Sequence, residues 1–567
     1  MENENQDQPH GYARGLTNYG DKAFALYLRR SFAKSIGYSS ELLSKPVIGI
    51  ASSPSGFNNC HRAMPELVEA VKRGVLAAGA LPIDFPTISL GEVYLSPTSL
   101  MFRNLMAMDV EEMVRAQPMD AVVLIGGCDK TVPAQLMGAA SADIPAVQLV
   151  TGPMMTGRHN GERLGACTDC RRFWSSFRAG KISAEEIGQV EGRLATTAST
   201  MACIAETLGM SLPGTAAIPA VHADRLRAAE ASGRAAVAML RNPIRPSQVI
   251  TRKSVENALR VLLALGGSTN AIIHLTAIAG RLGIRISLER LNELSDTTPV
   301  LVNLKPTGEN YMEDFHSAGG MSAVLRELRP LLHLDCISVT GETLEARLDS
   351  ERALYTDRKV IRPAADPVEP EGGLVALFGS LAPGGAILKR SAADKSLFER
   401  EGRAVVFHSL EDLAERIDSE DLDVSADDFL VLQNAGPTSG SGMPEAGYLP
   451  IPLKLARAGV KDMVRISDAR MSGTAFGTIV LHVTPEANLG GPLGLVRNGD
   501  RIRLSVARRR IDLLVDAGEL ERRRAAQPPA PPAPTRGYAK LYAEHVLQAD
   551  QGCDFDFLRS DKPAVSG

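Results

Sequence analysis

Unbroken apolar runs, each followed by a segment with helical spacing, constrain the fold of this chain more than any other sequence feature. Three such runs are VIGIAS (Val47–Ser52), MDAVVLIGG (Met119–Gly127) and PAVQLVTG (Pro145–Gly152). Between the first two, the stretch from Ala63 to Ala80 gathers apolar residues on one face of a predicted helix. Strands that are apolar on both faces are typical of a parallel sheet covered by helices on each side. The sequence therefore predicts an α/β region, with ligands expected at the carboxyl ends of its strands.

The character of the chain changes after residue 370, where Gly-rich segments and short β runs begin. The segment RIRLSV (Arg501–Val506) alternates apolar and polar residues, as a strand with one buried face does. A Pro/Ala-rich tether, Ala525–Gly537, then leads to a final helical segment. We predict three parts: an α/β region over residues 1–370, a β-rich sandwich or barrel over 371–524, and a tether, helix and tail over 525–567.

Composition excludes several classes of protein. Lys and Arg number 62 against 66 Asp and Glu, which argues against a protein that wraps nucleic acid through bulk positive charge. No apolar run approaches the roughly 20 residues that a membrane-spanning helix needs. Seven cysteines in 567 residues are too few for a disulfide scaffold, and no secretory signal is visible, so we expect a cytoplasmic protein. Its thiols are then expected to be buried, metal-binding or catalytic.

Two cysteines follow predicted strands at equivalent positions. The run LIGGCDKT ends a buried strand and continues with Cys128, Asp129 and Lys130, and Cys60 lies in another polar loop between a strand and a helix. Either thiol alone is more often structural than functional. Two of them in equivalent strand-to-helix loops favour a shared metal centre, because thiolates suit soft metals and iron–sulfur clusters.

Two further acids lie in loops. Glu92 follows a strand-like segment, and Glu445 is the single acid of a Gly/Pro/Ser-rich loop at 433–452. Each reads on its own as a solvated loop carboxylate. Together with Asp129 they would give the hard oxygen ligands that Mg²⁺ prefers, although spacing alone does not establish this.

The segment VRISDARMSGTAFGT brings together Ser472, Gly473 and Thr474. One interpretation is a glycine-containing turn with hydroxyl caps. The other is a nucleophile or base, Ser472. The segment is not a GxSxG elbow and no histidine is nearby, so a metal or another positive charge would have to activate this serine.

These motifs together resemble those of one enzyme family. The matching segments are GGCDKT, TASTM (Thr197–Met201), AETLGMSLPG, GGSTNAIIHL, NLKPTGENYMEDFHSAGG, GMPEAG and SDARMSGTAFGT. In this order they resemble the dihydroxy-acid dehydratase/6-phosphogluconate dehydratase family, from about Arg30 to the C-terminus. The segments PTISLGE and HVLQADQGCDFDFLR look most like the sugar-acid branch, such as L-arabinonate and D-xylonate dehydratases.

The resemblance implies a fold and a reaction. It implies an α/β N-terminal region with two subdomains, a C-terminal β-barrel-like domain, an active site between them, and a homodimer or homotetramer. The implied reaction dehydrates a 2,3-dihydroxy acid to a 2-keto-3-deoxy acid. An alternative is the branched-chain variant of that reaction, on 2,3-dihydroxy-3-methyl acids.

The resemblance also implies roles for individual residues. Cys60 and Cys128 would ligate an iron–sulfur cluster, 2Fe–2S rather than 4Fe–4S. Glu92, Asp129 and Glu445 would hold Mg²⁺, with Lys130 modified to a carbamate ligand. Ser472 as an alkoxide would be the base, and Thr474 would help to position the substrate.

The chain departs from the family at the third cluster cysteine. The family carries it in a loop just before TASTM, whereas this chain reads VEGRLATTASTMAC and lacks that loop. Cys203 follows TASTM in a predicted helix, where a packed core thiol is expected more often than a ligand. Cys167 and Cys170 form a CxxC pair with chelating spacing and are alternative third ligands. The missing loop leaves open a catalytically silent homologue without a cluster.

Overall fold

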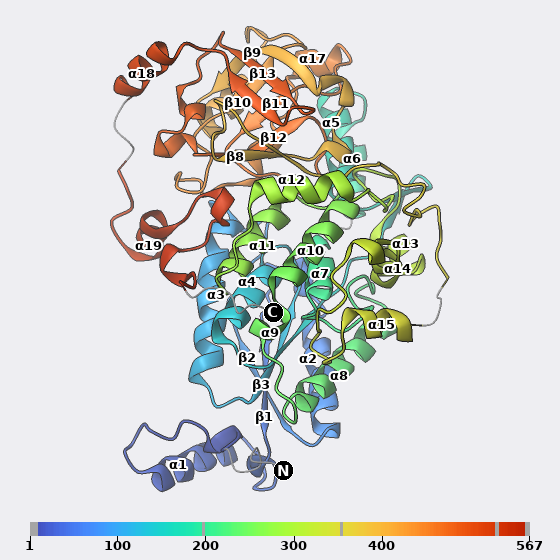
Figure 1. Ribbon diagram of the computed structural model, residues 1–567, viewed down its shortest axis with the longest axis vertical. Helices are drawn as coiled ribbons and strands as arrows, with labels where there is room; N and C mark the ends of the chain where they lie inside the picture. The colour runs from blue at the N-terminus through green and yellow to red at the C-terminus, as the bar shows by residue number, and fades with distance from the viewer. Residues whose placement is uncertain (1–8, 195–198, 352–354, 528–531, 562–567) are drawn as a thin grey trace.

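The computed structural model describes residues 9–194, 199–351, 355–527 and 532–561, and Figure 1 shows them arranged as two stacked units. The side chains of Ala166 and Cys167 also lie outside the described part. The N-terminal unit contains a parallel sheet flanked by helices, and the C-terminal unit contains a larger sheet (Figure 1).

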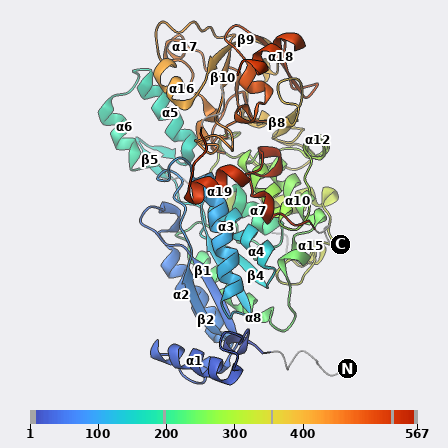
Figure 2. The same ribbon diagram turned by 90° about the vertical axis from the view of Figure 1, so that its left-hand side faces the viewer.

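The first sheet has four parallel strands in the order β2-β1-β3-β4. They are β1 (Val47–Ser52), β2 (Leu81–Pro86), β3 (Ala121–Gly126) and β4 (Ala146–Val150). Helices α2 (Met64–Ala77) and α8 (Ala223–Ala238) pack together on one face, and α3 (Ser99–Ala116) and α4 (Thr131–Ala142) on the other, as Figure 2 shows from the side. Every residue of β1, β3 and β4 is buried, which confirms the predicted sheet with two covered faces.

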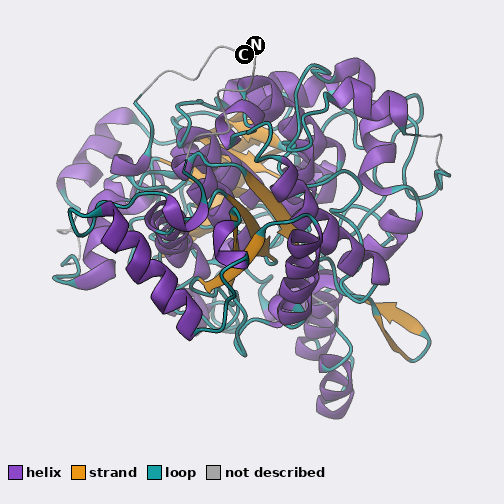
Figure 3. Cartoon of the chain, turned by 90° about the horizontal axis from the view of Figure 1, so that it is seen from below, coloured by secondary structure: helices purple, strands orange, loops and turns teal. Residues whose placement is uncertain are grey.

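A layer of helices links this sheet to the second unit. It includes α7 (Thr200–Thr207), α10 (Arg252–Ala264), α11 (Asn270–Gly280) and α14 (Gly320–Leu328). Their apolar faces share one continuous hydrophobic core with the four strands. Seen from below, helices lie on both sides of the strands (Figure 3). Among the described helices, none combines the length and the apolar character needed to cross a bilayer.

The other helices are shorter or more peripheral, and a small hairpin follows β4 along the chain. These helices are α1 (Lys22–Ser35), α5 (Ala166–Arg178), α6 (Ala184–Glu191), α9 (Pro246–Val249), α12 (Leu288–Thr297), α13 (Met312–Ser317), α15 (Leu344–Ser350), α16 (Leu410–Arg416), α17 (Leu453–Arg457), α18 (Ala517–Ala525) and α19 (Gly537–His545). The hairpin pairs β5 (Gly157–His159) with β6 (Glu162–Leu164).

The second sheet has eight strands in the order β14-β13-β9-β10-β11-β12-β8-β7. They are β7 (Val375–Leu377), β8 (Gly385–Leu388), β9 (Glu399–Phe407), β10 (Phe429–Leu432), β11 (Arg465–Ser467), β12 (Ile479–Thr484), β13 (Arg501–Ser505) and β14 (Arg510–Leu513). A bridge between Phe378 and Arg510 brings the two edges together, so the sheet is nearly closed. This confirms the barrel-like C-terminal domain, and Ile502 and Leu504 point into its core as their alternation predicts.

The C-terminal segment returns to the first unit. Helix α19 and the residues after it pack against α3 and α11 through a small apolar cluster that includes Tyr542 and Phe555. A buried ion pair between Arg281 and Asp554 reinforces this contact, with Nε 2.6 Å from Oδ2. Gln548 of the same segment bonds to Glu486 of the C-terminal unit. The segment therefore holds the two units against each other.

Candidate active site

The thiols of Cys60 and Cys128 lie side by side at the carboxyl ends of β1 and β3. These strands are parallel neighbours, so the loops that leave them meet at one edge of the sheet, and the two thiols hydrogen-bond to each other. His61 joins the loops because its Nε2 accepts the Gly127 N–H at 3.0 Å. A Cβ at Gly127 would lie 2.0 Å from the hydroxyl of Thr151, just after β4, and 3.1 Å from the Cys60 carbonyl oxygen, so glycine gives both neighbours room here.

The predicted acids lie beside the thiols. Glu92, Asp129 and Glu445, with the cations Lys130 and Arg470 that pair with them, are called the acid cage below. One ligand atom each from Glu92, Cys128 and Asp129 lies within 4.8 Å of the other two. Between the two carboxylates lies the fully buried Lys130, whose Nζ is 3.2 Å from Glu92 Oε2 and 2.5 Å from Asp129 Oδ2. Ser99 also donates a hydrogen bond to Glu92. These residues come from two strand-to-helix connections, so the sheet itself assembles the cage.

Arg470 joins the acids of the N-terminal unit to Glu445 of the C-terminal unit. Its guanidinium is buried, and its two terminal nitrogens lie 2.9 Å from Glu92 Oε1 and 2.6 Å from Glu445 Oε1. Asn270, at the start of α11, donates to the same Glu445 oxygen at 3.3 Å. All three predicted carboxylates therefore gather around two buried cations, Lys130 and Arg470.

The electrostatics of the cage follow from burial and from these cations. Burial raises the pKa of Glu92, but Lys130 and Arg470 outweigh it and hold that pKa well below its usual range. Burial and the neighbouring Glu92 charge raise the pKa of Asp129. Burial opposes the charge of Arg470, but Glu92 and Glu445 outweigh it and keep its pKa above the ordinary value. The charges of these acids and of the two cations thus depend on one another.

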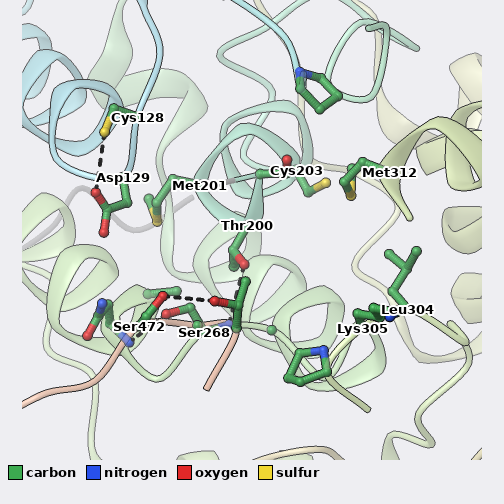
Figure 4. Close-up of a pocket in the computed structure, with 18 of the residues that line it drawn as sticks. Cys128, Asp129, Thr200, Met201, Cys203, Ser268, Leu304, Lys305, Met312 and Ser472 are labelled. Atoms are coloured by element: carbon green, nitrogen blue, oxygen red, sulfur yellow. Dashed lines mark hydrogen bonds between the residues drawn. The ribbon is translucent and has the colours of Figure 1, made fainter. Parts of the chain in front are cut away.

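Ser472 faces the cage from the loop between β11 and β12. Its Oγ lies 3.0 Å from the hydroxyl of Thr474, and Thr168 in α5 donates to the Thr474 carbonyl at 2.8 Å. A Cβ on Gly473 would lie 2.6 Å from the Cβ of Ser268, so glycine allows this loop to rest directly on the N-terminal unit. Figure 4 shows Ser472 beside Ser268 and Thr200, with Cys128 and Asp129 on the same side of the pocket.

These groups line one cavity of about 400 Å³ between the two units. Its polar lining comprises Cys60, Glu92, Cys128, Asp129, Cys203, Lys305, Asn310, Tyr311, Lys389, Glu445, Ser472 and Thr474, with others. At one part of the wall, Lys305 Nζ and the Tyr311 hydroxyl both lie 2.9 Å from the carboxylate of the buried Asp169. A cavity of this size with convergent polar groups is typical of a small-molecule site.

The three candidates for a third cluster ligand have different positions. Cys203 lies inside α7, as expected, and its buried side chain lines the cavity near Met201 and Met312 (Figure 4). It is not part of the described Glu92–Cys128–Asp129 group, and burial raises the pKa of its thiol. Cys170 is half-buried in α5, and the described cavity wall does not include it. The side chain of Cys167 and part of the TASTM motif, Thr197 and Ala198, lie outside the described residues.

Sequence reasoning missed two cations of the site. Arg470 lies within the motif SDARMSGT, but only the fold shows that it joins Glu92 to Glu445. Lys389 lies in AILKR, which carries no motif signal, and it reaches the cavity because β8 ends beside the Ser472 loop. No local pattern could have shown either contact.

The donor atoms fit the two cofactors that the motifs imply. Glu92 and Asp129 offer hard oxygen ligands of the kind that Mg²⁺ takes, with Lys130 between them, and Glu445 contacts the opposite side of Arg470 from Glu92. A contacting thiol pair with a further thiol on the same cavity wall suits iron in a sulfur-ligated centre.

Comparison with known proteins assigns the class. The N-terminal model of the dihydroxy-acid/6-phosphogluconate dehydratase family matches residues 45–347, and the C-terminal model of that family matches residues 359–553. The chain belongs to this family, which confirms the resemblance of its motifs, and it is a dehydratase, a carbon–oxygen lyase.

The similar proteins include enzymes named for sugar acids and enzymes named dihydroxy-acid dehydratase. The chain is 44% identical over 553 residues to the L-arabinonate dehydratase of Rhizobium leguminosarum bv. trifolii, covering 95% of each chain. It is 45% identical to the 6-deoxy-6-sulfo-D-gluconate dehydratase of Pseudomonas putida, covering 92% of each. The dihydroxy-acid dehydratase of Syntrophobacter fumaroxidans is 38% identical, over 92% of this chain and 96% of its own length.

Proposed function

We propose that this protein dehydrates a sugar acid, a 2,3-dihydroxy aldonate, to the corresponding 2-keto-3-deoxy acid. The observation that carries the proposal is that the thiol pair, the acid cage and Ser472 line one cavity although they come from two units of the chain. Relatives named for sugar acids are 44–45% identical, against 38% for a named dihydroxy-acid dehydratase, which favours a sugar acid over a branched-chain substrate.

Ser472 acts as the base in this proposal. Its alkoxide takes the proton from C2 of the substrate, while the Thr474 hydroxyl, 3.0 Å away, orients the serine oxygen and contacts the substrate. Loss of the C3 hydroxyl then gives an enol, which tautomerises to the ketone without any oxidant. Because a neutral serine is a weak base, positive charge near Ser472 is essential to this step.

Glu92, Asp129 and Glu445 would hold Mg²⁺, which when bound would stabilise negative charge on the substrate carboxylate and C2 oxygen. Lys130 would complete this set as a carbamate. Its ammonium would first lose a proton, and the free amine would then add CO₂ and release a second proton, which converts a cation between Glu92 and Asp129 into an anionic oxygen ligand. Arg470 holds Glu92 and Glu445 in place from the other side of the cage.

Cys60 and Cys128, with Cys203 as the candidate third ligand, would hold an iron–sulfur cluster of the 2Fe–2S type, whose iron would supply a Lewis acid for the departing C3 hydroxide. Cys167 and Cys170 stay alternatives for the third position. Because this chain lacks the cysteine-bearing loop of its family, cluster content is the first quantity to measure.

The wall formed by Lys305, Asn310 and Tyr311 supports a polyhydroxylated substrate. These side chains offer an ammonium, an amide and a phenol to a ligand in the cavity. A sugar acid carries hydroxyls beyond C3 that can form hydrogen bonds with such groups, whereas a branched alkyl chain offers them none.

The direct test is turnover by anaerobically purified protein. Iron, sulfide and magnesium are quantified first, and a panel of pentonates, hexonates and 2,3-dihydroxyisovalerate is then assayed for 2-keto acid product. We expect turnover of at least one aldonate and slower or no turnover of dihydroxyisovalerate. Turnover of dihydroxyisovalerate alone would favour the branched-chain reaction, and an iron-free, inactive protein would favour the silent homologue.

We also propose that the chain assembles as a homodimer or homotetramer, as the family resemblance implies. Light scattering coupled to size exclusion gives the mass directly, and a mass near 60.5 kDa, that of one chain, would contradict this proposal.

A further inference from the structure

Lys389 is a buried lysine on the cavity wall. It follows β8, and its side chain is 1% exposed. Its Nζ donates to the backbone carbonyl of Gly473 at 2.9 Å, the only hydrogen-bond partner of this ammonium among the described residues. Gly473 lies between Ser472 and Thr474, so Lys389 is anchored on the loop that carries the proposed base.

No carboxylate neutralises Lys389 within the described part of the chain. Burial alone lowers the pKa of its ammonium, to about 7, with no acidic group opposing the shift. A buried charge without a counterion is costly, and negative charge close to the ammonium offsets that cost. The lysine should therefore be most stable as a cation when negative charge develops close to it.

The other cations of the cavity already have acidic partners. Lys130 and Arg470 are held by the acid cage, and Lys305 is paired with Asp169. Lys389 thus differs from them in having no acidic partner, and its carbonyl anchor is one residue from Ser472. A serine that must become an alkoxide needs such a charge, because a nearby cation favours the ionised form.

We propose that Lys389 is a positioning residue for Ser472: its ammonium, anchored on the Gly473 carbonyl, holds the serine loop and stabilises the serine oxygen as it loses its proton. This inference rests on the proposed function, in which Ser472 is the base. It adds that Lys389 supplies the positive charge that the proposed base needs.

A purely structural lysine would behave differently. If Lys389 served only to anchor the loop, its loss would destabilise the protein and lower activity without changing how Ser472 responds to pH. If it stabilises the alkoxide, methionine should be tolerated in the fold, since it replaces an unpaired buried charge by an apolar chain of similar length.

The kinetic experiment compares the wild type with Lys389→Met, Lys389→Arg and Lys395→Met. Lys395 is exposed on the same unit and paired with Glu369, which makes it a matched control outside the cavity. We expect K389M to lower kcat about 100-fold with KM changed by less than about threefold, K389R to recover part of kcat, and K395M to match the wild type. A raised KM with unchanged kcat, or no change at all, would overturn the inference.

The pH profile isolates the effect on Ser472. Other ionisable groups line the same cavity and are common to all variants; they are Cys60, Glu92, Cys128, Asp129, Cys203, His274, Lys305, Tyr311 and Glu445. A shift that appears only in K389M therefore comes from the lysine. In K389M, we expect the rising limb of the pH profile of kcat to shift to higher pH by about one unit or more. An unshifted limb with a lower Tm would identify a structural anchor instead.

A second experiment does not depend on turnover. An alkyl fluorophosphonate reacts with activated serine oxygens with loss of fluoride, and peptide mass mapping reports its rate at Ser472. We expect K389M to be labelled at least tenfold more slowly than the wild type and K395M, with Ser472→Ala unlabelled at this position. Equal rates, or a wild type that is not labelled up to pH 9, would refute the inference. A wild type that is labelled but dehydrates no aldonate would refute only the proposed function.

Discussion

Among single residues, the proposed dehydration depends most on the side-chain oxygen of Ser472. We expect Ser472→Ala to lower turnover at least about 1,000-fold, because it removes the oxygen that takes the C2 proton in the proposed reaction. Iron content and the circular dichroism spectrum should match the wild type. Ser396→Ala, an exposed serine of the same unit, is the control and should retain full activity. An S472A protein with wild-type kcat would remove this serine from the mechanism.

Arg470 should be essential to the acid cage. In Mg²⁺-free protein, Arg470→Met leaves Glu92 and Glu445 partly buried without this cation, so we expect the free energy of unfolding to fall by about 3–5 kcal/mol. Added Mg²⁺ should recover part of the loss, since it replaces the missing positive charge. Urea unfolding with and without Mg²⁺ measures both quantities, and a variant as stable as the wild type in Mg²⁺-free buffer would contradict the arrangement described.

Lys389 should leave a signature in the pH dependence of stability. Its pKa is about 7 in the folded protein, below the roughly 10.4 of an unfolded chain, so the unfolded state binds more protons between these values. The cost of burying this lysine is therefore full below pH 7 and fades as pH rises toward 10. Relative to the wild type, K389M should gain a few kcal/mol at pH 6 and much less at pH 9.5. Urea unfolding at the two pH values measures this difference, and an advantage that does not change with pH would show that the lysine is not buried as a cation.

At the scale of elements, the site depends on loops packed backbone to backbone. A Cβ on Gly473 would lie 2.6 Å from the Cβ of Ser268, just before α11. We expect Gly473→Ala to cost about 1–3 kcal/mol of stability and to lower kcat by displacing Ser472. The double variant Gly473→Ala/Ser268→Gly removes the clash and should regain most of both. If the second change restores nothing, the contact between these loops is not what positions the serine.

The elements that could be predicted from the sequence are those with a recognisable pattern of apolar and polar residues within the element itself. The apolar runs at β1, β3 and β4 indicated a buried parallel sheet, and parallel topology then brings Cys60 and Cys128 to one edge. The alternation in RIRLSV likewise indicated β13. The parallel order of β9 to β12 was not predicted, because short strands separated by irregular loops carry no pattern that specifies their neighbours. The contacts of Arg470 and Lys389 depend on that order, so they could not be predicted either.

At the scale of the whole molecule, the cavity exists only while the two units stay together. The C-terminal segment contacts both, and its Asp554 is fully buried against Arg281. We expect Asp554→Asn to lower the free energy of unfolding by about 3 kcal/mol, because it removes one of the two carboxylates that pair with the buried Arg281 guanidinium and leaves Glu111 as the other. Glu544→Gln, which breaks an exposed pair with Lys540, should change it by less than about 1 kcal/mol. Similar effects of both variants in urea unfolding would mean that the segment is not a structural link.

In the proposed reaction, one cavity built by both units removes water from a sugar acid through proton abstraction at C2. The most direct measurement is turnover of the aldonate panel in D₂O by anaerobically purified protein, with the product analysed by mass spectrometry and NMR. We expect a 2-keto-3-deoxy acid that carries one solvent deuterium at C3, and no such product from S472A. A product without deuterium at C3, or iron-loaded wild-type protein that dehydrates no aldonate, would contradict it.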